Sequence, residues 1–312
     1  MKRIHLIFGL AGVLFAACAH AQPAARELAR DDGSRIRYYL EPRDPARRSD
    51  RLLLVIQGSD CNSVTRVRII KSDLVRAWPQ ADLLTVEKYG IDDTLPYDGD
   101  PERPDCPAAY LERDNLQQRA SDLDAVLTEL RRTLGYRQVV ALGGSEGAVV
   151  ANLLASRSRN VDATIAFNGG GQWFLNDMLH SLASEPVPAA QRRAAEQGLR
   201  SFARHVLASP PQAMNMSGHG HGWWRSVLEL DQLATLRQVA GPVLILQGGA
   251  DASVSPQETL SMVARLRLAG SRNIDYRAYP GLDHAMTGPD GISRMPEVVD
   301  DMAAWLRRTL AP

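Results

Sequence analysis

Gly143, Ser145 and Gly147 form a Gly-x-Ser-x-Gly pattern within the stretch GGSEG. A serine hydroxyl becomes a useful nucleophile near neutral pH only when a base accepts its proton and a carboxylate orients that base. The pattern alone also fits a small residue in a glycine-rich loop. Its meaning therefore depends on the elements on each side of Ser145 and on whether the chain supplies an acid and a base.

Ser145 lies between a predicted strand and a predicted helix. The residues QVVALGG directly before it are mostly apolar, as expected for a strand that is buried on both faces. The residues EGAVVANLLASRS after it have the apolar spacing of a helix. Glycines around a strand-to-helix turn allow the serine backbone to adopt strained angles and raise its hydroxyl above the sheet edge. This context favours a nucleophile at Ser145.

The acid and the base are expected later in the chain, in the order Ser, acid, His, each after a later strand. Asp251 closes the stretch VLILQGGAD, and His284 follows the last predicted strand in GLDHAM. His284 is the candidate base and Asp251 the candidate acid. Asp275 and Asp283 are alternatives for the acid. Asp275 lies inside a predicted strand, and Asp283 is adjacent to the histidine, so neither is well placed to reach the imidazole.

An oxyanion hole needs backbone N–H groups that point at the developing negative charge. The N–H of Glu146, the residue after the nucleophile, is one candidate donor. A second donor is expected in the loop IQGSDCNSV, which follows an early buried strand. Ser59 is the first candidate there, with Gly58 and Asp60 beside it. An ordinary surface turn is the alternative interpretation of this loop.

The remaining chain alternates short apolar runs with amphipathic stretches and contains no internal repeat. This alternation predicts the α/β class. The predicted strands cover residues 34–42, 51–59, 81–90, 138–144, 162–171, 241–251 and 273–281. The predicted helices cover residues 115–135, 146–158, 256–268 and 295–310.

Composition argues against several functional classes. The chain has 312 residues, of which 45% are hydrophobic, enough for one large core or two modest ones. Its 36 basic residues balance 36 acidic residues, and no basic block is interleaved with aromatic residues, so nucleic-acid binding is not expected. His219 and His221 form a His-x-His pair, but no acidic residue stands at ligand spacing, so no metal site is expected.

Residues 1–21 have the pattern of a secretory signal peptide. A basic MKR precedes an apolar stretch too short for a membrane span, and AHA supplies a cleavage pattern before Gln22. We therefore expect a periplasmic or secreted protein; a lipid anchor at Cys18 is the alternative. Because such compartments are oxidising, the two other cysteines, Cys61 and Cys106, are expected to form a disulfide.

The stretches GGSEG, GGAD and GLDH together resemble the nucleophile elbow, acid loop and His loop of a secreted α/β-hydrolase. The resemblance covers about residues 34–310. Within this superfamily the chain is similar to the dienelactone hydrolase, prolyl oligopeptidase and serine aminopeptidase branches. It implies a mostly parallel central sheet with helices on both faces. The early loop begins Gln57-Gly58, where many members have His-Gly, so the assignment of the oxyanion donors stays open.

The same resemblance implies the domain layout. After the signal peptide, residues 22–312 form one α/β-hydrolase domain. An insertion at about residues 172–240 occupies the position where α/β-hydrolases commonly carry a helical cap, and helices are expected at about 174–182 and 189–207.

A cap shapes the substrate pocket, so substrate-binding residues are expected within the insertion. Trp223 and Trp224 could form an apolar wall, and Arg225 could bind a substrate carboxylate. The alternative is that the tryptophans only pin the insertion to the core.

The expected activity is hydrolysis through an acyl-enzyme without metal or cofactor, with Ser145, His284 and Asp251 as the triad. An ester is the first expected substrate. A short peptide or acyl amide is the second, since Glu146 or groups in the insertion could recognise an amine. Two other hypotheses are a catalytically silent binding module with the same fold and a metal-dependent enzyme centred on the His-x-His pair.

Overall fold

The computed structural model describes residues 24–100 and 103–310. The predicted signal peptide and Cys18 lie outside these residues. Within the described ranges, no helix combines the length and the hydropathy that crossing a bilayer requires.

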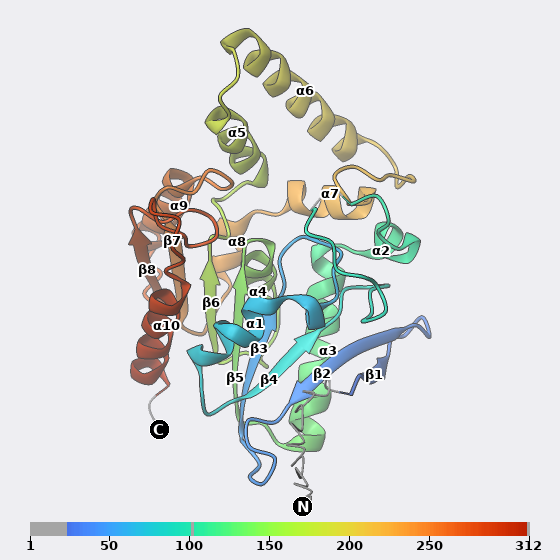
Figure 1. The fold of residues 1–312 in the computed structure, drawn as a ribbon, viewed down its shortest axis with the longest axis vertical. Helices are drawn as coiled ribbons and strands as arrows, with labels where there is room; N and C mark the ends of the chain where they lie inside the picture. The colour runs from blue at the N-terminus through green and yellow to red at the C-terminus, as the bar shows by residue number, and fades with distance from the viewer. Residues whose placement is uncertain (1–23, 101–102, 311–312) are drawn as a thin grey trace, which may run out of the picture.

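The described residues form one eight-stranded sheet at the centre of the molecule (Figure 1). The strands are β1 (Arg26–Ala29), β2 (Arg35–Glu41), β3 (Arg51–Ile56), β4 (Asp82–Val86), β5 (Gln138–Gly144), β6 (Ala163–Phe167), β7 (Val243–Gly248) and β8 (Ile274–Tyr279). Their order across the sheet is β1-β2-β4-β3-β5-β6-β7-β8. Strands β3 to β8 are parallel, and β1 and β2 are antiparallel to their neighbours. This is the mostly parallel sheet that the sequence predicts.

Helices cover both faces of this sheet. They are α1 (Arg68–Ser72), α2 (Ala108–Arg113), α3 (Leu116–Leu134), α4 (Glu146–Arg157), α5 (Phe174–Ser184), α6 (Ala189–Ala208), α7 (His221–Glu229), α8 (Gln232–Arg237), α9 (Pro256–Leu268) and α10 (Met295–Thr309). The longer predicted elements are all present. The sequence did not predict β1, α1, α2, α7 or α8, which are short.

Helix α3 shows why the bounds of a long helix can be predicted from the sequence. Asn115 precedes it, and the Asn115 side chain accepts a hydrogen bond from the Gln118 N–H, which satisfies one free donor at the helix start. Gly135 ends it with a φ of 74°, the left-handed conformation that glycine adopts most easily. The start and the end of α3 therefore follow from single residues.

The central strands are apolar throughout because each face meets a different layer of helices. On β3, Leu52 and Leu54 belong to the core cluster that contains side chains of α3 and α4. Their neighbours Leu53 and Val55 belong to the cluster on the opposite face, which contains side chains of α10. Alternate residues of a strand point to opposite faces, so both sets must be apolar. The sheet thus provides a rigid base for the loops at its carboxyl edge.

The segment between β6 and β7 carries α5, α6, α7 and α8. The helices expected at about 174–182 and 189–207 are present as α5 and α6. Figure 1 shows these two helices projecting beyond the body, while α7 lies across the end of the sheet. On α6 only Ala203 and Val206 are fully buried, so this helix has little contact with the core.

Candidate active site

Ser145 lies on the turn between β5 and α4, with φ 54° and ψ −130°. Its N–H donates to the Phe167 carbonyl oxygen at 2.9 Å. A Cβ atom on Gly143 would lie 2.1 Å from the Gly147 carbonyl oxygen, and one on Gly147 would lie 2.2 Å from the Ile56 carbonyl oxygen. Neither position accepts a side chain. The turn is therefore strained and tightly packed, as the flanking glycines predict.

His284 and Asp251 meet at the same edge of the sheet as Ser145. Asp251 follows β7, His284 follows β8, and His284 Nδ1 lies 2.8 Å from Asp251 Oδ2. Burial alone would raise the pKa of Asp251, but the hydrogen bond and charge of His284 and the N–H groups of Val254 and Ser253 hold it below its usual 3.8. An ionised carboxylate only accepts hydrogen bonds, so His284 Nδ1 is the donor in this contact, and in the neutral imidazole the lone pair is then on Nε2.

Ser145 Oγ forms no hydrogen bond within the described part of the chain. The contact between a catalytic serine and its base is often long in an unliganded enzyme and shortens when substrate binds. The structure therefore places the serine and the histidine at the same edge of the sheet, without a hydrogen bond between them.

The two alternative acids have other partners. Asp275 accepts a hydrogen bond from Trp305 Nε1 at 2.7 Å, near the start of β8, whereas the acid loop follows the end of β7. Asp283 accepts the N–H groups of Ala285 and Thr287 at 2.9 and 2.8 Å and so shapes its own turn. Of the three aspartates, Asp251 is the one whose carboxylate contacts His284.

Asn168 is a site residue that the sequence analysis missed. It follows β6, is fully buried and has a positive φ of 50°. Its Nδ2 donates to the His284 carbonyl oxygen at 2.8 Å, and its Oδ1 accepts the Gly248 N–H at 2.8 Å. Asn168 thus fastens the His284 loop to the end of β7. One sequence signal could have identified it: in FNGGG, the polar Asn168 directly follows an apolar strand.

Helix α5 also contacts the acid loop. His180 Nε2 donates to the Asp251 carbonyl oxygen at 2.9 Å. Asp177 accepts the N–H groups of Gly171 and Ser255 at 3.0 and 2.8 Å, and burial raises the pKa of Asp177 to about 6. These contacts fix the first turns of α5 against the loop that carries Asp251.

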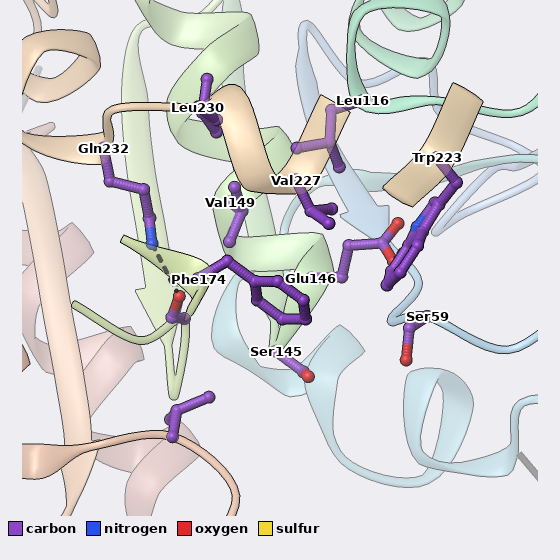
Figure 2. Close-up of a pocket in the computed structure, with 12 residues that line it drawn as sticks. Ser59, Leu116, Ser145, Glu146, Val149, Phe174, Trp223, Val227, Leu230 and Gln232 are labelled. Carbon is purple, nitrogen blue, oxygen red and sulfur yellow. Dashed lines mark hydrogen bonds between the residues drawn. The ribbon is translucent and has the colours of Figure 1, made fainter. Parts of the chain in front are cut away.

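A cavity of about 90 Å³ lies beside Ser145 (Figure 2). Its polar lining consists of Ser59, Ser145, Glu146, Gly169 and Gln232. Its apolar wall comes mainly from α3, α4, α5 and α7 and consists of Leu116, Val149, Phe174, Trp223, Val227, Leu230 and Val254. The cavity therefore combines a candidate nucleophile with an apolar interior.

The three candidate substrate-binding residues of the insertion lie in different places. Trp223 lines the cavity. Trp224 packs edge-on against Phe202, with ring centroids 5.0 Å apart. Arg225 forms a hydrogen bond with Glu229 and lines a separate surface groove. Trp224 and Arg225 do not line the cavity beside Ser145, so a substrate-binding role for them stays a prediction that this cavity does not support.

Buried side chains hold the backbone of the candidate oxyanion loop after β3. Arg119 Nη2 donates to the Gln57 carbonyl oxygen at 2.8 Å. Tyr110 donates to the Ser59 carbonyl oxygen at 3.4 Å, and Lys88 donates to the next carbonyl oxygen, that of Asp60. Three donors, on α3, on α2 and just after β4, thus fix three carbonyl groups of one short loop.

This loop lies directly against the nucleophile. A Cβ atom on Gly58 would be 3.8 Å from Ser145 Cβ. Figure 2 shows the Ser59 and Ser145 hydroxyls on the same side of the cavity. The loop is therefore in position to place N–H groups near Ser145.

Glu146 forms a buried ion pair within the cavity wall. Its Oε1 pairs with Arg119 Nη1, and its Oε2 accepts a hydrogen bond from Trp223 Nε1 at 2.7 Å. Burial alone would raise the pKa of Glu146, but the charges of Arg119 and Lys88 hold it below its usual value. Both carboxylate oxygens already have partners. Recognition of a substrate amine by Glu146 is therefore not supported.

The His-x-His pair is divided between two environments. The His219 ring stacks on Trp223 with centroids 3.6 Å apart, and His219 Nδ1 lies 3.0 Å from the Tyr110 hydroxyl. Burial lowers the pKa of His219 to about 4, so it is neutral near pH 7. His221 lines the same surface groove as Arg225. Across the described residues, no group of three or more possible ligand side chains is placed to hold a metal ion.

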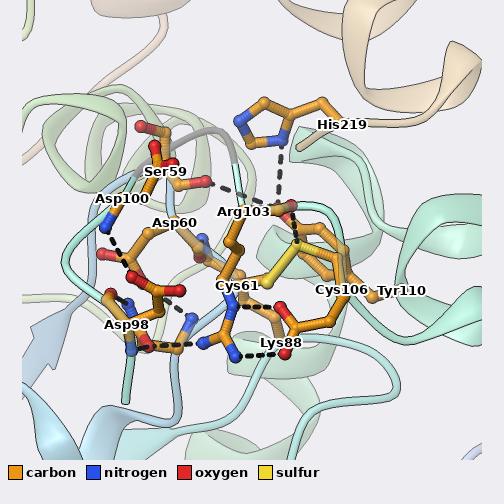
Figure 3. Close-up of a disulfide and its surroundings, with 12 residues drawn as sticks. Ser59, Asp60, Cys61, Lys88, Asp98, Asp100, Arg103, Cys106, Tyr110 and His219 are labelled. Atoms are coloured by element: carbon orange, nitrogen blue, oxygen red, sulfur yellow. Dashed lines mark hydrogen bonds and ion pairs between the residues drawn. A yellow bond between two sulfur atoms is a disulfide. The ribbon is translucent and has the colours of Figure 1, made fainter. Parts of the chain in front are cut away.

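The disulfide expected between Cys61 and Cys106 is present (Figure 3). It joins the candidate oxyanion loop to the segment just before α2, with a Cα–Cα distance of 5.9 Å and a sequence separation of 45. Both cysteines are buried. Near the bridge, Arg103 pairs with Asp105 and donates to Asn62 Oδ1 at 2.9 Å. The bridge therefore ties the candidate oxyanion loop to the segment before α2.

Replacing both cysteines with alanine is expected to lower the free energy of unfolding by roughly 3–4 kcal/mol, because a cross-link over a loop of this size restricts the unfolded chain. We also expect kcat to fall, since the loop beside Ser145 loses one support. Urea unfolding measures the first effect and ester hydrolysis the second. Unchanged unfolding in the double variant would show that the bridge contributes little to stability.

The sheet order, the strained serine turn after β5, and the acid and histidine after β7 and β8 define an α/β-hydrolase. Residues 109–312 match the prolyl oligopeptidase family. The chain belongs to this family, and it is a serine hydrolase that acts on an ester or a peptide.

Several solved structures are similar over most of this chain. An esterase from an Arctic intertidal metagenomic library has 16% identity and a TM-score of 0.57, over 91% of this chain and 92% of that one. A Pyrococcus furiosus esterase has 14% identity and a TM-score of 0.61, over 92% and 91%. The Pyrococcus horikoshii acylaminoacyl peptidase has 15% identity and a TM-score of 0.59, over 92% of this chain and 42% of that one.

Because the sequence identities are low, these similarities show the fold alone. The chain spans less than half the length of the acylaminoacyl peptidase. No protein with curated function matches the chain in sequence.

Proposed function

We propose that this chain is an exported serine hydrolase that cleaves an ester, or secondarily an amide, through an acyl-enzyme formed on Ser145. The observation that carries the proposal is the 2.8 Å contact between His284 Nδ1 and Asp251 Oδ2 at the sheet edge where the strained Ser145 turn lies. A lone serine on a turn would not need an oriented base.

In the proposed reaction Ser145 Oγ attacks the substrate carbonyl carbon while His284 Nε2 takes the hydroxyl proton. Collapse of the tetrahedral intermediate breaks the bond to the leaving group, which receives that proton from His284. Water then attacks the acyl-enzyme and gives a proton to His284. The bond between the acyl carbon and Ser145 Oγ breaks, Oγ takes that proton back from His284, and the acid is released. Asp251 holds the imidazole in the required tautomer and stabilises its charged form.

The proposed oxyanion donors are the N–H of Glu146 and an N–H from the Gly58–Ser59 region. Such a donor typically contributes about 3 kcal/mol of transition-state stabilisation. The fixed carbonyl groups of Gln57, Ser59 and Asp60 support this assignment, since a held loop does not need to reorganise during the reaction.

An ester is the preferred substrate class in this proposal. The one carboxylate in the cavity lining, that of Glu146, is paired with Arg119 and Trp223, so it offers no free anion for a substrate amine. We further propose that residues 172–240 act as the cap. The support is that α5 and α7 supply Phe174, Trp223 and Val227 to the cavity wall.

Export is proposed from the sequence of residues 1–21. The Cys61–Cys106 disulfide supports it, because structural disulfides persist mainly in oxidising compartments.

Labelling with a fluorophosphonate tests the proposal. The purified mature protein is expected to form a covalent adduct that peptide mass spectrometry locates on Ser145. The variant Ser145→Ala should not be labelled, and Ser59→Ala, which removes a second serine hydroxyl from the same cavity, should still be labelled. A folded wild-type protein that neither reacts with the probe nor hydrolyses any activated ester would instead support the silent binding module.

A further inference from the structure

We propose that the 90 Å³ cavity is the acyl pocket and that it selects short, uncharged acyl groups of about four to five carbons, counting the carbonyl carbon. This inference rests on the proposed function and names its substrate class. Three observations carry it: the position of the cavity relative to His284, its volume, and the chemistry of its wall.

The position of the cavity identifies it as the acyl side. During the reaction the leaving group receives its proton from His284, so the leaving group must lie next to that imidazole. The cavity lining includes Ser145 and the candidate oxyanion residues but does not include His284. The His284 side chain is 31% exposed. The acyl group therefore enters the cavity, and the leaving group faces the more open side.

The volume sets the length of the acyl group. An apolar cavity of about 150 Å³ accepts benzene, which corresponds to roughly 25 Å³ per carbon. At that value a cavity of about 90 Å³ holds about three to four carbons beyond the carbonyl carbon. Butanoyl and pentanoyl groups fit this space, and an octanoyl group does not.

The wall chemistry excludes a charged acyl group. Seven of the lining residues are apolar. Glu146 is the ionisable side chain of the lining, and both of its oxygens are already engaged. The Gln232 side-chain amide nitrogen donates to the carbonyl oxygens of Gly169 and Gly171. A carboxylate or an ammonium group on the acyl chain would lose its water and gain no free side chain of opposite charge in the lining.

Val227 on α7 is the residue expected to set the length limit. It is buried, lines the cavity, and belongs to the same core cluster as Trp223. Val206 on α6 provides a matched control, because it is an equally buried valine of the insertion that does not line the cavity. Substitution of Val227 should change acyl length preference, and the same substitution of Val206 should not.

The test measures kcat/KM for p-nitrophenyl esters from acetyl to octanoyl, with the leaving group held constant. Wild type is expected to prefer butanoyl or pentanoyl over octanoyl by about tenfold or more, since each misfitting methylene in an apolar pocket changes specificity by about that factor. The hemisuccinate ester, which places a carboxylate at a similar depth, should be hydrolysed at least about tenfold more slowly than the butanoyl ester.

Two variants test the pocket itself. Val227→Ala removes two methyl carbons and should raise the octanoyl-to-butanoyl ratio by about tenfold, whereas Val227→Leu should shift the preference toward propanoyl. Val206→Ala should leave the ratio at the wild-type value. Because the ratio compares two substrates on one preparation, partial unfolding of a variant does not change it.

The outcomes separate the two proposals. Equal kcat/KM for butanoyl and octanoyl esters in wild type, or equal effects of the two alanine variants on the ratio, would overturn the acyl pocket while leaving Ser145 as the nucleophile. Absence of both ester hydrolysis and fluorophosphonate labelling would overturn the proposed function and the acyl pocket with it.

Discussion

Replacing His284 with alanine is expected to lower kcat for a p-nitrophenyl ester by at least about 10⁴-fold. Without the imidazole no group accepts the Ser145 proton, and what activity remains comes from binding and the oxyanion donors. Asp251 keeps three other hydrogen-bond donors, the N–H groups of Ser253 and Val254 and the side chain of Gln247, so the acid loop should stay folded. Steady-state kinetics measures the loss, and thermal unfolding checks the fold.

His205→Ala is the matched control, because His205 is an exposed histidine on α6. It should retain wild-type kcat. Asp251→Asn should also lose about 10⁴-fold, because an amide in place of the carboxylate favours the wrong imidazole tautomer. A folded His284→Ala variant with activity similar to His205→Ala would show that another residue serves as the base.

Replacing Arg119 with methionine is expected to have the largest effect on stability, about 3–5 kcal/mol of the free energy of unfolding. Arg119 and Glu146 are both buried, and removing the cation leaves an unpaired carboxylate beside Ser145. The Gln57 carbonyl oxygen loses its donor at the same time. We therefore expect kcat to fall as well, since the loop and the turn next to Ser145 both lose their common anchor.

Two further variants make this prediction specific. Arg119→Met combined with Glu146→Gln should recover part of the lost stability, because Glu146 then no longer leaves an unpaired carboxylate in the interior. Arg132→Met, on the solvent side of the same helix, should cost less than about 1 kcal/mol, since the Arg132–Glu129 pair is exposed. Urea unfolding compares the three. An Arg119→Met variant no less stable than Arg132→Met would contradict a structural role for the buried pair.

The sequence could place the three candidate triad residues at one edge of the sheet because chain order and sheet order are coupled. In a parallel sheet every carboxyl end lies at one edge, so residues that directly follow β5, β7 and β8 must come near one another. Ser145, Asp251 and His284 each follow one of these strands. No knowledge of side-chain packing was needed to place them.

The residues that support the site could not be placed in the same way. Asn168 and His180 act through hydrogen bonds to backbone atoms of distant loops, and such contacts leave no periodic signal. Arg119 did leave a sequence signal. It lies on the apolar face of α3, three residues after Leu116 and four before Leu123, and a charge at such a position needs a buried partner.

The insertion was the least predictable part of the site. Helix α7 was not expected, and without it the directions of consecutive side chains there are unknown. Successive helix residues differ by about 100° in direction. Trp223 therefore faces the cavity while Trp224 and Arg225 point elsewhere, although the three are adjacent in the sequence.

The hydrogen bond from His180 to the Asp251 carbonyl oxygen has a consequence for how this protein can be altered. Insertions of this kind look interchangeable, because they join the body through two chain connections. Here α5 also supports the loop that orients the proposed base. A foreign insertion without a donor at the position of His180 would bring a new pocket wall and at the same time loosen the acid loop. If α5 belongs to the proposed cap and Asp251 to the proposed triad, we expect recombining this segment to change substrate range and proton transfer together.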